Sequence, residues 1–313
     1  MTLRKFLVFR PLNLFIIALT QIFVFYFLLK PVLNANGITP VLSHFLFILL
    51  VGSTVLLAAA GYLINDYFDV RMDTINKPNK LFVGKNVRRR SAIKWHIAIS
   101  IIGLSIGFFV AHKVGIWSLG FIHLGCFIML LQYSEIYKRK LLTGNLLIAL
   151  LAAVTILVPA LYETVSISIF YLKDSFTANY LIYTILLYSG FAFITTIIRE
   201  IVKDIEDMPG DIDSHCKTLP IVIGIEKAKN VLLLLMFVLL CTLSYYAYIR
   251  YINHDEKIFV YTILALILPC MYISYAIYTA QVPEQFKRIS NLVKLVMVAG
   301  IATLPLLYFI FQR

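Results

Sequence analysis

Nine long apolar segments constrain this sequence more than any other feature. A membrane-spanning helix needs about 20 mainly apolar residues. Hydrophobic residues make up 61% of the chain and charged residues 14%, against roughly 25% charged in soluble domains. The polar residues are too few to cover a water-soluble protein, which excludes a soluble enzyme, a coiled coil and a disordered chain. We therefore predict an all-α bundle of nine transmembrane helices in a single domain over residues 1–313. The nine segments lie near residues 11–33, 43–64, 93–111, 115–135, 144–162, 179–199, 228–249, 258–280 and 292–311.

The distribution of basic residues predicts the orientation of this bundle. With the N-terminus in the cytoplasm, 22 of the 28 Lys and Arg residues fall on the cytoplasmic side. Cytoplasmic loops of membrane proteins carry such an excess. We therefore expect a multi-pass protein of the cell (inner) membrane, with a cytoplasmic N-terminus and an outer C-terminus. The net charge of +12 then follows from topology, and no nucleic-acid partner is expected. The basic N-terminus leads into an apolar run without a small-residue cleavage site, so we interpret it as a retained first helix.

Acidic residues gather in two short windows. Nine of the sixteen Asp and Glu residues lie in residues 66–73 and 200–213. In the first window, Asp66, Asp69 and Asp73 are spaced i, i+3 and i+7, which puts them on one face of a helix. The second window repeats this spacing at Asp204, Asp207 and Asp211. Both windows follow apolar segments and fall on the predicted cytoplasmic side.

This pattern indicates a metal site. Like charges on one helical face repel each other, and near a bilayer they also lose hydration, so a cation is needed to neutralise them. Oxygen ligands without His or Cys favour a hard ion, Mg²⁺ above Ca²⁺ or Mn²⁺. A solvated acidic loop end would explain one cluster equally well, but two clusters with identical spacing favour metal. All six aspartates are predicted to be catalytic. The predicted metal ligands are Asn65, Asp69, Asp73, Asp207 and Asp211, with Asp66 and Asp204 as helpers.

Basic residues near the two windows are candidates for phosphate binding, since Lys and Arg bind phosphate oxygens. Retention of positive charge in cytoplasmic loops is the alternative explanation. We favour charge retention for residues 88–90, whereas charge retention and phosphate binding both stay open for Lys77, Lys80 and Lys138. The residues predicted to bind substrate are Lys77, Lys80, Tyr133, Lys138, Arg139, Lys203 and Lys217.

The two motifs resemble those of a known family. The string NDYFDVRMD at residues 65–73 is similar to the first aspartate-rich motif of the UbiA superfamily of intramembrane prenyltransferases, and DIEDMPGD at 204–211 is similar to the second. The resemblance covers essentially the whole chain. Leu81 replaces a proline usual in the family, and the spacing from Tyr133 to Lys138 is one residue longer than usual.

The resemblance implies a Mg²⁺-dependent enzyme that transfers a polyprenyl group from an isoprenyl diphosphate to a lipophilic acceptor within the lipid bilayer. Metal ions and bases would stabilise the departing diphosphate. The strings REIVKDIEDMPGD and KTLPI, Arg10-Pro11 with Asn13, and Gly144-Asn145 are most similar to the prenyl ether branch. That branch implies a geranylgeranyl donor and geranylgeranylglyceryl phosphate as acceptor, with Lys138, Arg139 and Lys203 as candidates for the acceptor phosphate. No obligate protein partner is inferred.

Three other functions could use a cluster of carboxylates in a membrane protein. An aromatic prenyltransferase acting on hydroxybenzoate, naphthoate or homogentisate shares the metal chemistry and differs in its acceptor pocket. A CDP-alcohol phosphotransferase requires DG and AR within one continuous motif, which this chain lacks. A cation transporter would place its carboxylates near the bilayer midplane on broken helices, whereas these windows lie at helix ends beside basic loops. Prenyl transfer therefore remains the main hypothesis, with the aromatic acceptor as the alternative.

Overall fold

The computed structural model describes residues 7–76, 82–85 and 87–311, and this part of the chain is helical, with one isolated bridge between Val83 and Val87 as its extended structure. The long helices are α2 (Pro11–Val24), α4 (His44–Phe68), α6 (Arg89–Lys113), α7 (Gly120–Glu135), α8 (Thr143–Tyr162), α10 (Ser175–Glu206), α13 (Ile225–Ile252), α15 (Leu268–Thr279) and α16 (Pro283–Ile301). The shorter α-helices are α3 (Lys30–Ala35), α5 (Val70–Asn76), α9 (Thr164–Lys173), α11 (Met208–Asp213), α12 (Leu219–Ile223), α14 (Glu256–Tyr261) and α17 (Thr303–Phe311). The remaining turns are π-helical at η2 (Phe25–Leu29) and η6 (Thr262–Ile267), and 3₁₀-helical at η1 (Leu7–Phe9), η4 (Trp117–Leu119) and η5 (Tyr137–Arg139).

The nine predicted spans are confirmed. Within the described residues, nine helical stretches are long and apolar enough to cross a membrane. Eight of them are longer than the segment predicted from apolar residues, because polar ends continue the helix, whereas Trp117–Glu135 is shorter than the predicted 115–135. The longest covers Ser175–Glu206, where the apolar segment ran from 179 to 199. Large apolar side chains lie on the surface, among them Leu172 at 86% and Phe176 at 85% exposure. Lipid tails would surround such side chains favourably, whereas in water they would be exposed apolar surface.

The chain divides into two compact units. Unit 1 comprises Met1–Lys138 and Val154–Leu187, and unit 2 comprises Arg139–Ala153 and Tyr188–Arg313. The chain passes from one unit to the other between Lys138 and Arg139, then within α8, and again within α10. The single domain over residues 1–313 stays a prediction, and so does the cytoplasmic N-terminus.

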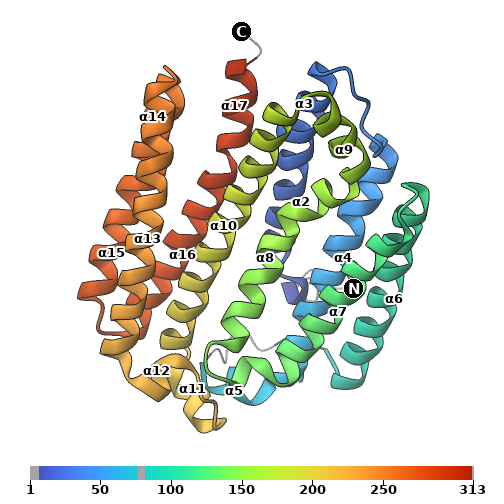
Figure 1. Ribbon diagram of the computed structural model, residues 1–313. Helices are drawn as coiled ribbons and strands as arrows, with labels where there is room; N and C mark the ends of the chain where they lie inside the picture. The colour runs from blue at the N-terminus through green and yellow to red at the C-terminus, as the bar shows by residue number, and fades with distance from the viewer. Residues whose placement is uncertain (1–6, 77–81, 86, 312–313) are drawn as a thin grey trace. The chain divides into compact units, whose positions relative to one another are not determined.

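Unit 1 is built around α4, with α6 and α7 beside it (Figure 1). The Ser43 hydroxyl accepts a hydrogen bond from the Leu46 amide at 3.3 Å and caps the start of α4. Small residues let the helices approach closely, as is usual for helices in membranes. A Cβ at Gly61 would lie 3.0 Å from Leu130 of α7, and one at Gly103 would lie 3.1 Å from Leu57. This packing fixes the direction of α4, which ends in the first acidic window.

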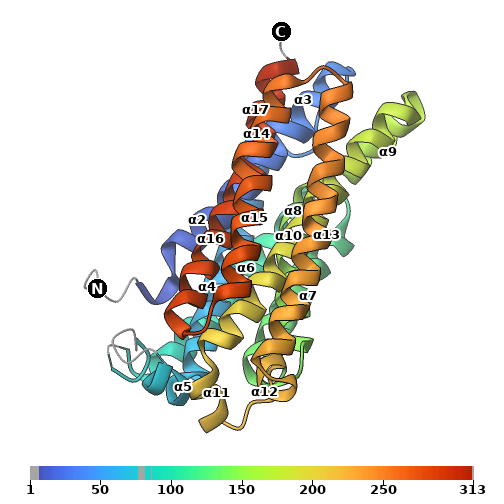
Figure 2. The same ribbon diagram turned by 90° about the vertical axis from the view of Figure 1, so that its left-hand side faces the viewer.

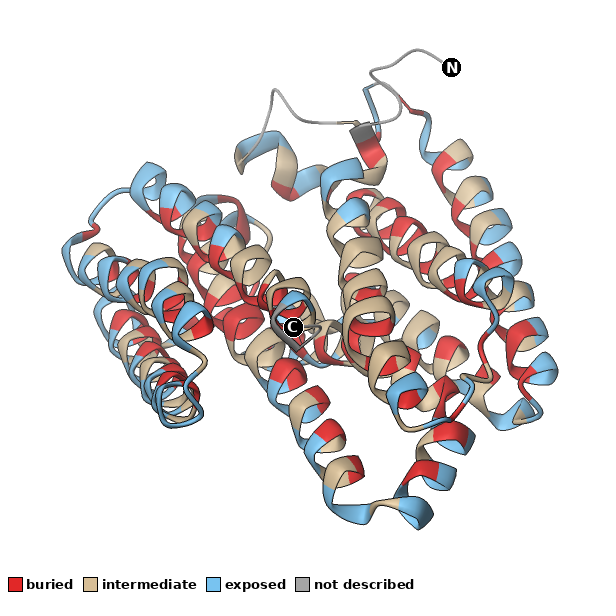
Figure 3. Ribbon diagram, turned by 90° about the horizontal axis from the view of Figure 1, so that it is seen from above, coloured by how far each residue is buried: buried red, intermediate tan, exposed pale blue. Residues whose placement is uncertain are grey.

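Unit 2 contains the larger apolar core. It is formed where the second half of α10 packs with α13, α15 and α16 (Figure 2). Buried residues follow one side of these helices and exposed residues the other (Figure 3). Among the fully buried side chains, Ile198 and Ile201 come from α10 and Phe286 comes from α16. The core therefore holds the C-terminal part of α10, which carries the second acidic window.

Candidate active site

Each acidic motif bends at its second aspartate. In unit 1, α4 ends at Phe68 and α5 begins at Val70, while Asp69 between them has φ −84° and ψ 0°. In unit 2, α10 ends at Glu206 and α11 begins at Met208, and Asp207 has φ −93° and ψ 2°. The hydrogen bonds from residue i to i−4 nevertheless continue, from the Asp69 amide to Asn65 at 2.9 Å and from the Asp207 amide to Lys203 at 2.8 Å. Each motif is thus two helical pieces joined by a bend, where the spacing alone predicted one continuous helical face.

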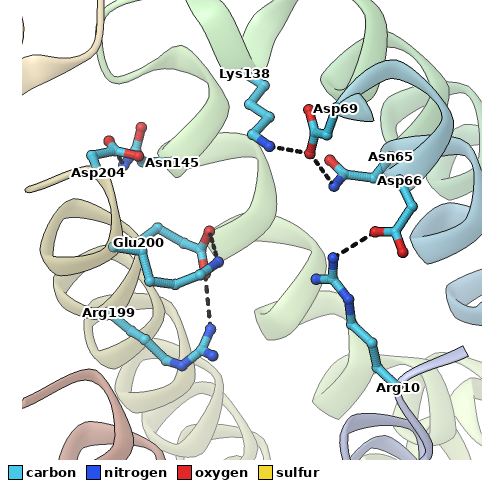
Figure 4. A network of polar contacts seen from close by, with 10 residues as sticks. Arg10, Asn65, Asp66, Asp69, Lys138, Asn145, Arg199, Glu200 and Asp204 are labelled. Carbon is cyan, nitrogen blue, oxygen red and sulfur yellow. Dashed lines mark hydrogen bonds and ion pairs between the residues drawn. The ribbon is translucent and has the colours of Figure 1, made fainter. Parts of the chain in front are cut away.

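In the first motif, Asn65 and Asp69 bond to each other. The Asn65 Nδ2 group donates to Asp69 Oδ2 at 2.6 Å, and the Lys138 ammonium group forms an ion pair with the same oxygen (Figure 4). The other two oxygens of this pair, Asn65 Oδ1 and Asp69 Oδ1, are buried and have no hydrogen-bond partner among the described residues. Buried oxygens of this kind are costly unless something else binds them. They are the ligand type that a hard divalent cation takes.

Asp66, the first aspartate, faces a different partner. The Arg10 guanidinium donates to Asp66 Oδ1 at 2.7 Å and lies 5.0 Å from the centre of the Tyr62 ring (Figure 4). Arg10 has φ +51°, a left-handed conformation that is uncommon outside glycine, and Pro11 starts α2 directly after it. Burial opposes the charge of Arg10, yet the Asp66 carboxylate raises the pKa of the guanidinium above its ordinary value. Asp66 is therefore tied to the start of α2.

In the second motif, the first aspartate is again held by a residue distant in sequence. The Asn145 Nδ2 group, in the first turn of α8, donates to Asp204 at 2.8 Å (Figure 4). Asp207 is half-buried at the bend, and Asp211 is buried on α11. One turn before Asp204, the buried Glu200 forms ion pairs with Arg199 and Lys203, each at 2.9 Å.

The remaining predicted residues lie as follows. Asp73 is half-buried on α5, and Tyr133 is half-buried on α7. Arg139 and Lys217 are exposed, and the Lys217 amide donates to the Arg139 carbonyl at 2.9 Å. Lys77 and Lys80 lie outside the described residues. Unit 1 thus brings together Asn65, Asp69 and Lys138. The roles predicted for these three and for the other site residues stay predictions.

Four residues of these networks had no predicted site role: Arg10, Asn145, Arg199 and Glu200. Arg10 and Asn145 stood out only as part of short strings shared with the prenyl ether branch. Their sequence separations from Asp66 and Asp204 are 56 and 59 residues, so no local spacing links them to the motifs. Glu200 carried a signal that could have been used, because it continues the Asp204 and Asp207 face by one helical turn.

The donor set of the first motif fits a magnesium ion. Among the described residues, no three Asp, Glu, His or Cys side chains are grouped closely enough to hold a metal. The fit rests instead on Asn65 Oδ1 and Asp69 Oδ1, two buried oxygens without partners. Mg²⁺ is usually held by one or two protein carboxylates, and its other ligands are water and phosphate oxygens. Two protein oxygens are therefore enough to begin such a site.

Buried oxygens without partners beside a lysine, on helices long enough to span a bilayer, fit a membrane protein that binds a divalent cation. The comparisons with known proteins identify the family. The profile of the UbiA prenyltransferase family matches residues 22–298, so the chain belongs to this family and is an integral membrane prenyltransferase.

Several archaeal relatives are named digeranylgeranylglyceryl phosphate synthase. The protein of Methanosphaera stadtmanae is 28% identical over 238 residues, 76% of this chain and 79% of its own length. The protein of Saccharolobus solfataricus is 35% identical over 185 residues, 59% of each chain. The protein of Methanobrevibacter smithii is 30% identical over 209 residues, 67% of this chain and 69% of its own length.

Solved structures show the same fold. A digeranylgeranylglyceryl phosphate synthase structure matches with a TM-score of 0.62 at 22% identity, covering 97% of this chain and 98% of its own. A UbiA homologue from Archaeoglobus fulgidus, bound to GPP and Mg²⁺, matches with a TM-score of 0.60 at 16% identity, covering 96% of this chain and 99% of its own. These likenesses confirm the predicted helical fold.

Proposed function

We propose that this chain transfers a geranylgeranyl group from geranylgeranyl diphosphate to geranylgeranylglyceryl phosphate and so forms a prenyl ether lipid. The observation that carries the reaction type is the group of Asn65, Asp69 and Lys138, which puts two unpartnered oxygens beside an ammonium group. The acceptor is supported by the relatives named digeranylgeranylglyceryl phosphate synthase at 28–35% identity.

The proposed cofactor is Mg²⁺. Its proposed ligands are Asn65, Asp69 and Asp73 in the first motif, and Asp207 and Asp211 in the second. When bound, a divalent ion neutralises the diphosphate and makes it a better leaving group. Asp66 and Asp204 act as helpers, since Arg10 and Asn145 already occupy one oxygen of each. Asp66 and Asp204 hold the first turn of each motif in place through these hydrogen bonds. The aspartates that follow them in each motif are proposed to bind the metal.

Lysine side chains are proposed to bind the phosphate oxygens that the metal does not bind. Lys138 is in contact with Asp69, so its ammonium group would be available to a phosphate oxygen of a diphosphate held beside this carboxylate. Charge-assisted hydrogen bonds of this kind are the strong ones. Lys77, Lys80, Tyr133 and Lys217 are proposed to assist in substrate binding, as expected from the sequence. The apolar interior of the bundle excludes water from the allylic cation until the acceptor hydroxyl attacks.

We further propose that the active site faces the cytoplasm of the cell membrane. The support is the distribution of bases, with 22 of 28 Lys and Arg residues on the side that carries both motifs. Isoprenyl diphosphates are charged and do not cross a bilayer unaided, so a site on the side where they are made is physically consistent.

One assay tests the proposed function. The purified protein in detergent would receive labelled geranylgeranyl diphosphate and Mg²⁺, with geranylgeranylglyceryl phosphate, 4-hydroxybenzoate, or no acceptor in parallel. We expect a labelled ether lipid in the first reaction only, and its loss when EDTA is added. Prenylation of 4-hydroxybenzoate without the ether product would assign the chain to the aromatic branch, and turnover unchanged by EDTA would contradict the metal.

A further inference from the structure

A group of exposed bases lies at the start of α6 in unit 1. It comprises Lys85, Arg88, Arg89, Arg90 and Lys94, and we call it the α6 basic group. The first turn of α6 contains no acidic residue. The sequence has no Asp or Glu at all between Asp73 and Glu135. The α6 basic group is therefore an exposed concentration of positive charge.

The charge of this group has no acidic counterpart in the described part of the chain. None of the ion pairs within residues 7–76, 82–85 and 87–311 includes one of these five bases, and the rest of the chain contains no Asp or Glu. Arg90 and Lys94 are one helical turn apart, a spacing at which like charges repel each other. The start of a helix also carries a positive partial charge. An anion is therefore the partner that this surface favours.

Two of the bases continue an exposed apolar stripe of α6. Arg90, Lys94, Ile97 and Ile101 are spaced i, i+4, i+7 and i+11, which puts them on one face of the helix. Ile97 is 50% exposed and Ile101 is 58% exposed. The buried residues of α6 recur every three or four positions from Ala92 to Val110 on the other side, where α6 packs against α4 and α7 (Figure 1). The exposed face thus begins with charge and continues as hydrocarbon.

We propose that Arg90 and Lys94 bind the phosphate of an anionic bilayer lipid, whose hydrocarbon chain lies along Ile97 and Ile101. Such a lipid has its anionic headgroup at the membrane surface and its apolar tails below, the same order as the exposed face of α6. Clusters of Lys and Arg directly beside a spanning helix attract anionic lipids. Charge retention explains on which side of the membrane these bases lie. It does not explain why they share a face with exposed apolar residues.

A fluorescent reporter on this face tests the proposal. The chain has two tryptophans, Trp95 and Trp117, which are replaced by Phe, and Ile97→Trp then supplies the only one. The protein is reconstituted in bilayers that contain brominated phosphatidylglycerol or brominated phosphatidylcholine with identical chains, because bromine quenches tryptophan fluorescence on contact. Since each base near an anionic membrane surface changes affinity about five-fold, we expect phosphatidylglycerol to be preferred by about five-fold or more.

Charge variants show whether the two bases carry this preference. Arg90→Gln and Lys94→Gln together should bring the affinity ratio close to one, whereas Arg90→Lys with Lys94→Arg should keep it, because charge carries the attraction. The control is Lys113→Gln, which removes an exposed base from the other end of the same helix and should leave the ratio unchanged. Salt at 1 M should weaken the preference, since the screening length falls from about 8 Å at physiological ionic strength to about 3 Å.

The protein with its native tryptophans provides a second readout. Native mass spectrometry in detergent should show more bound phosphatidylglycerol than phosphatidylcholine, and Arg90→Gln with Lys94→Gln should remove the difference. Equal binding of the two lipids, or a preference that survives this double variant, would overturn the proposal and leave charge retention as the explanation. A raised KM for geranylgeranyl diphosphate in detergent would assign these bases to the substrate and would also overturn it. Lipid binding is measured without turnover, so the result does not depend on the proposed acceptor.

Discussion

At the scale of single residues, each motif divides its aspartates between two tasks. The first aspartate is held by a polar residue from elsewhere in its unit, Arg10 for Asp66 and Asn145 for Asp204. The second aspartate lies at a bend between helices. At Asp69 the bend leaves one oxygen buried and unpartnered. We therefore propose that structural support and ligand binding are carried by different carboxylates of the same motif.

Replacing Asp69 by Ala should abolish turnover and leave the fold intact. The change removes a carboxylate that we assign to charge stabilisation in the transition state, and loss of one such group costs roughly 100-fold to 1,000-fold in rate. Lys138 loses its ion pair with Asp69, but its side chain is 28% exposed and can reach water. Activity assays and thermal unfolding in detergent, compared with Asp69→Asn, would test this; a large fall in melting temperature would mean that Asp69 is structural.

Replacing Lys138 by Met should tighten metal binding and weaken catalysis. In the protein without metal, the Lys138 ammonium group pairs with the Asp69 carboxylate and so competes with any cation for it. Removing the competitor should lower the Kd for Mn²⁺ by several-fold, since a pair of unit charges near a protein surface interacts by about 4 kcal/mol before solvation costs. Mn²⁺ titration followed by electron paramagnetic resonance measures this directly. The exposed Lys140→Met provides the control, and an unchanged or weaker Mn²⁺ affinity in Lys138→Met would show that the lysine does not compete.

At the scale of helices, close packing holds the motif-bearing segments. In unit 2, Gly300 of α16 lies against Phe191 of α10, and a Cβ at this position would come within 2.3 Å of the phenyl ring. In unit 1, the Arg10-Pro11 junction starts α2 and simultaneously binds the end of α4 through Asp66. The direction of each helix end is therefore set by contacts far from that end in sequence.

Gly300→Ala should destabilise the protein, because overpacking of a full interior costs about 1–3 kcal/mol. Gly190→Ala is the matched control, since no atom lies within 4 Å of the added Cβ there. We expect a lower melting temperature for Gly300→Ala and an unchanged or slightly higher one for Gly190→Ala, as alanine favours helix. Equal melting temperatures for the two variants would show that Phe191 moves aside without cost.

At the scale of the whole molecule, the polypeptide is organised by the bilayer. Nine apolar stretches within the described residues are long enough to span it, and both acidic motifs follow such stretches. With a cytoplasmic N-terminus, 22 of 28 bases lie on the motif side, which predicts the orientation.

Cysteine labelling in intact cells tests that orientation. The chain has four free cysteines, Cys126, Cys216, Cys241 and Cys270, which would first be replaced by Ala. A single new cysteine at Lys85, between the first motif and α6, should then resist a membrane-impermeant maleimide until the cells are opened. A cysteine at Asn253, between α13 and α14, should react from outside. The reverse pattern would invert the topology and move the site to the outer face.

The sequence by itself was sufficient for the nine spans, the helical class and the two motifs. The reason is that lipid offers no hydrogen bonds, so each crossing segment must satisfy its own backbone as a helix, and its length and hydropathy are read locally. The i, i+3, i+7 spacing of the aspartates is likewise a local property. The spacing could not predict the bends at Asp69 and Asp207, because a bend depends on the residues packed around the helix end.

Only the tertiary structure decided which partner each aspartate has. Arg10 and Asp66 are 56 residues apart, Asn145 and Asp204 are 59 apart, and Lys138 and Asp69 are 69 apart. Such pairs form where packed helices bring their ends together, and the spacing of residues in the sequence does not predict that packing. The same packing buries Asn65 Oδ1 and Asp69 Oδ1 away from water. The aspartate pattern therefore indicated metal binding. Which oxygens lack a hydrogen-bond partner depends on burial and on long-range contacts, because desolvation of a polar group is determined by the surrounding fold.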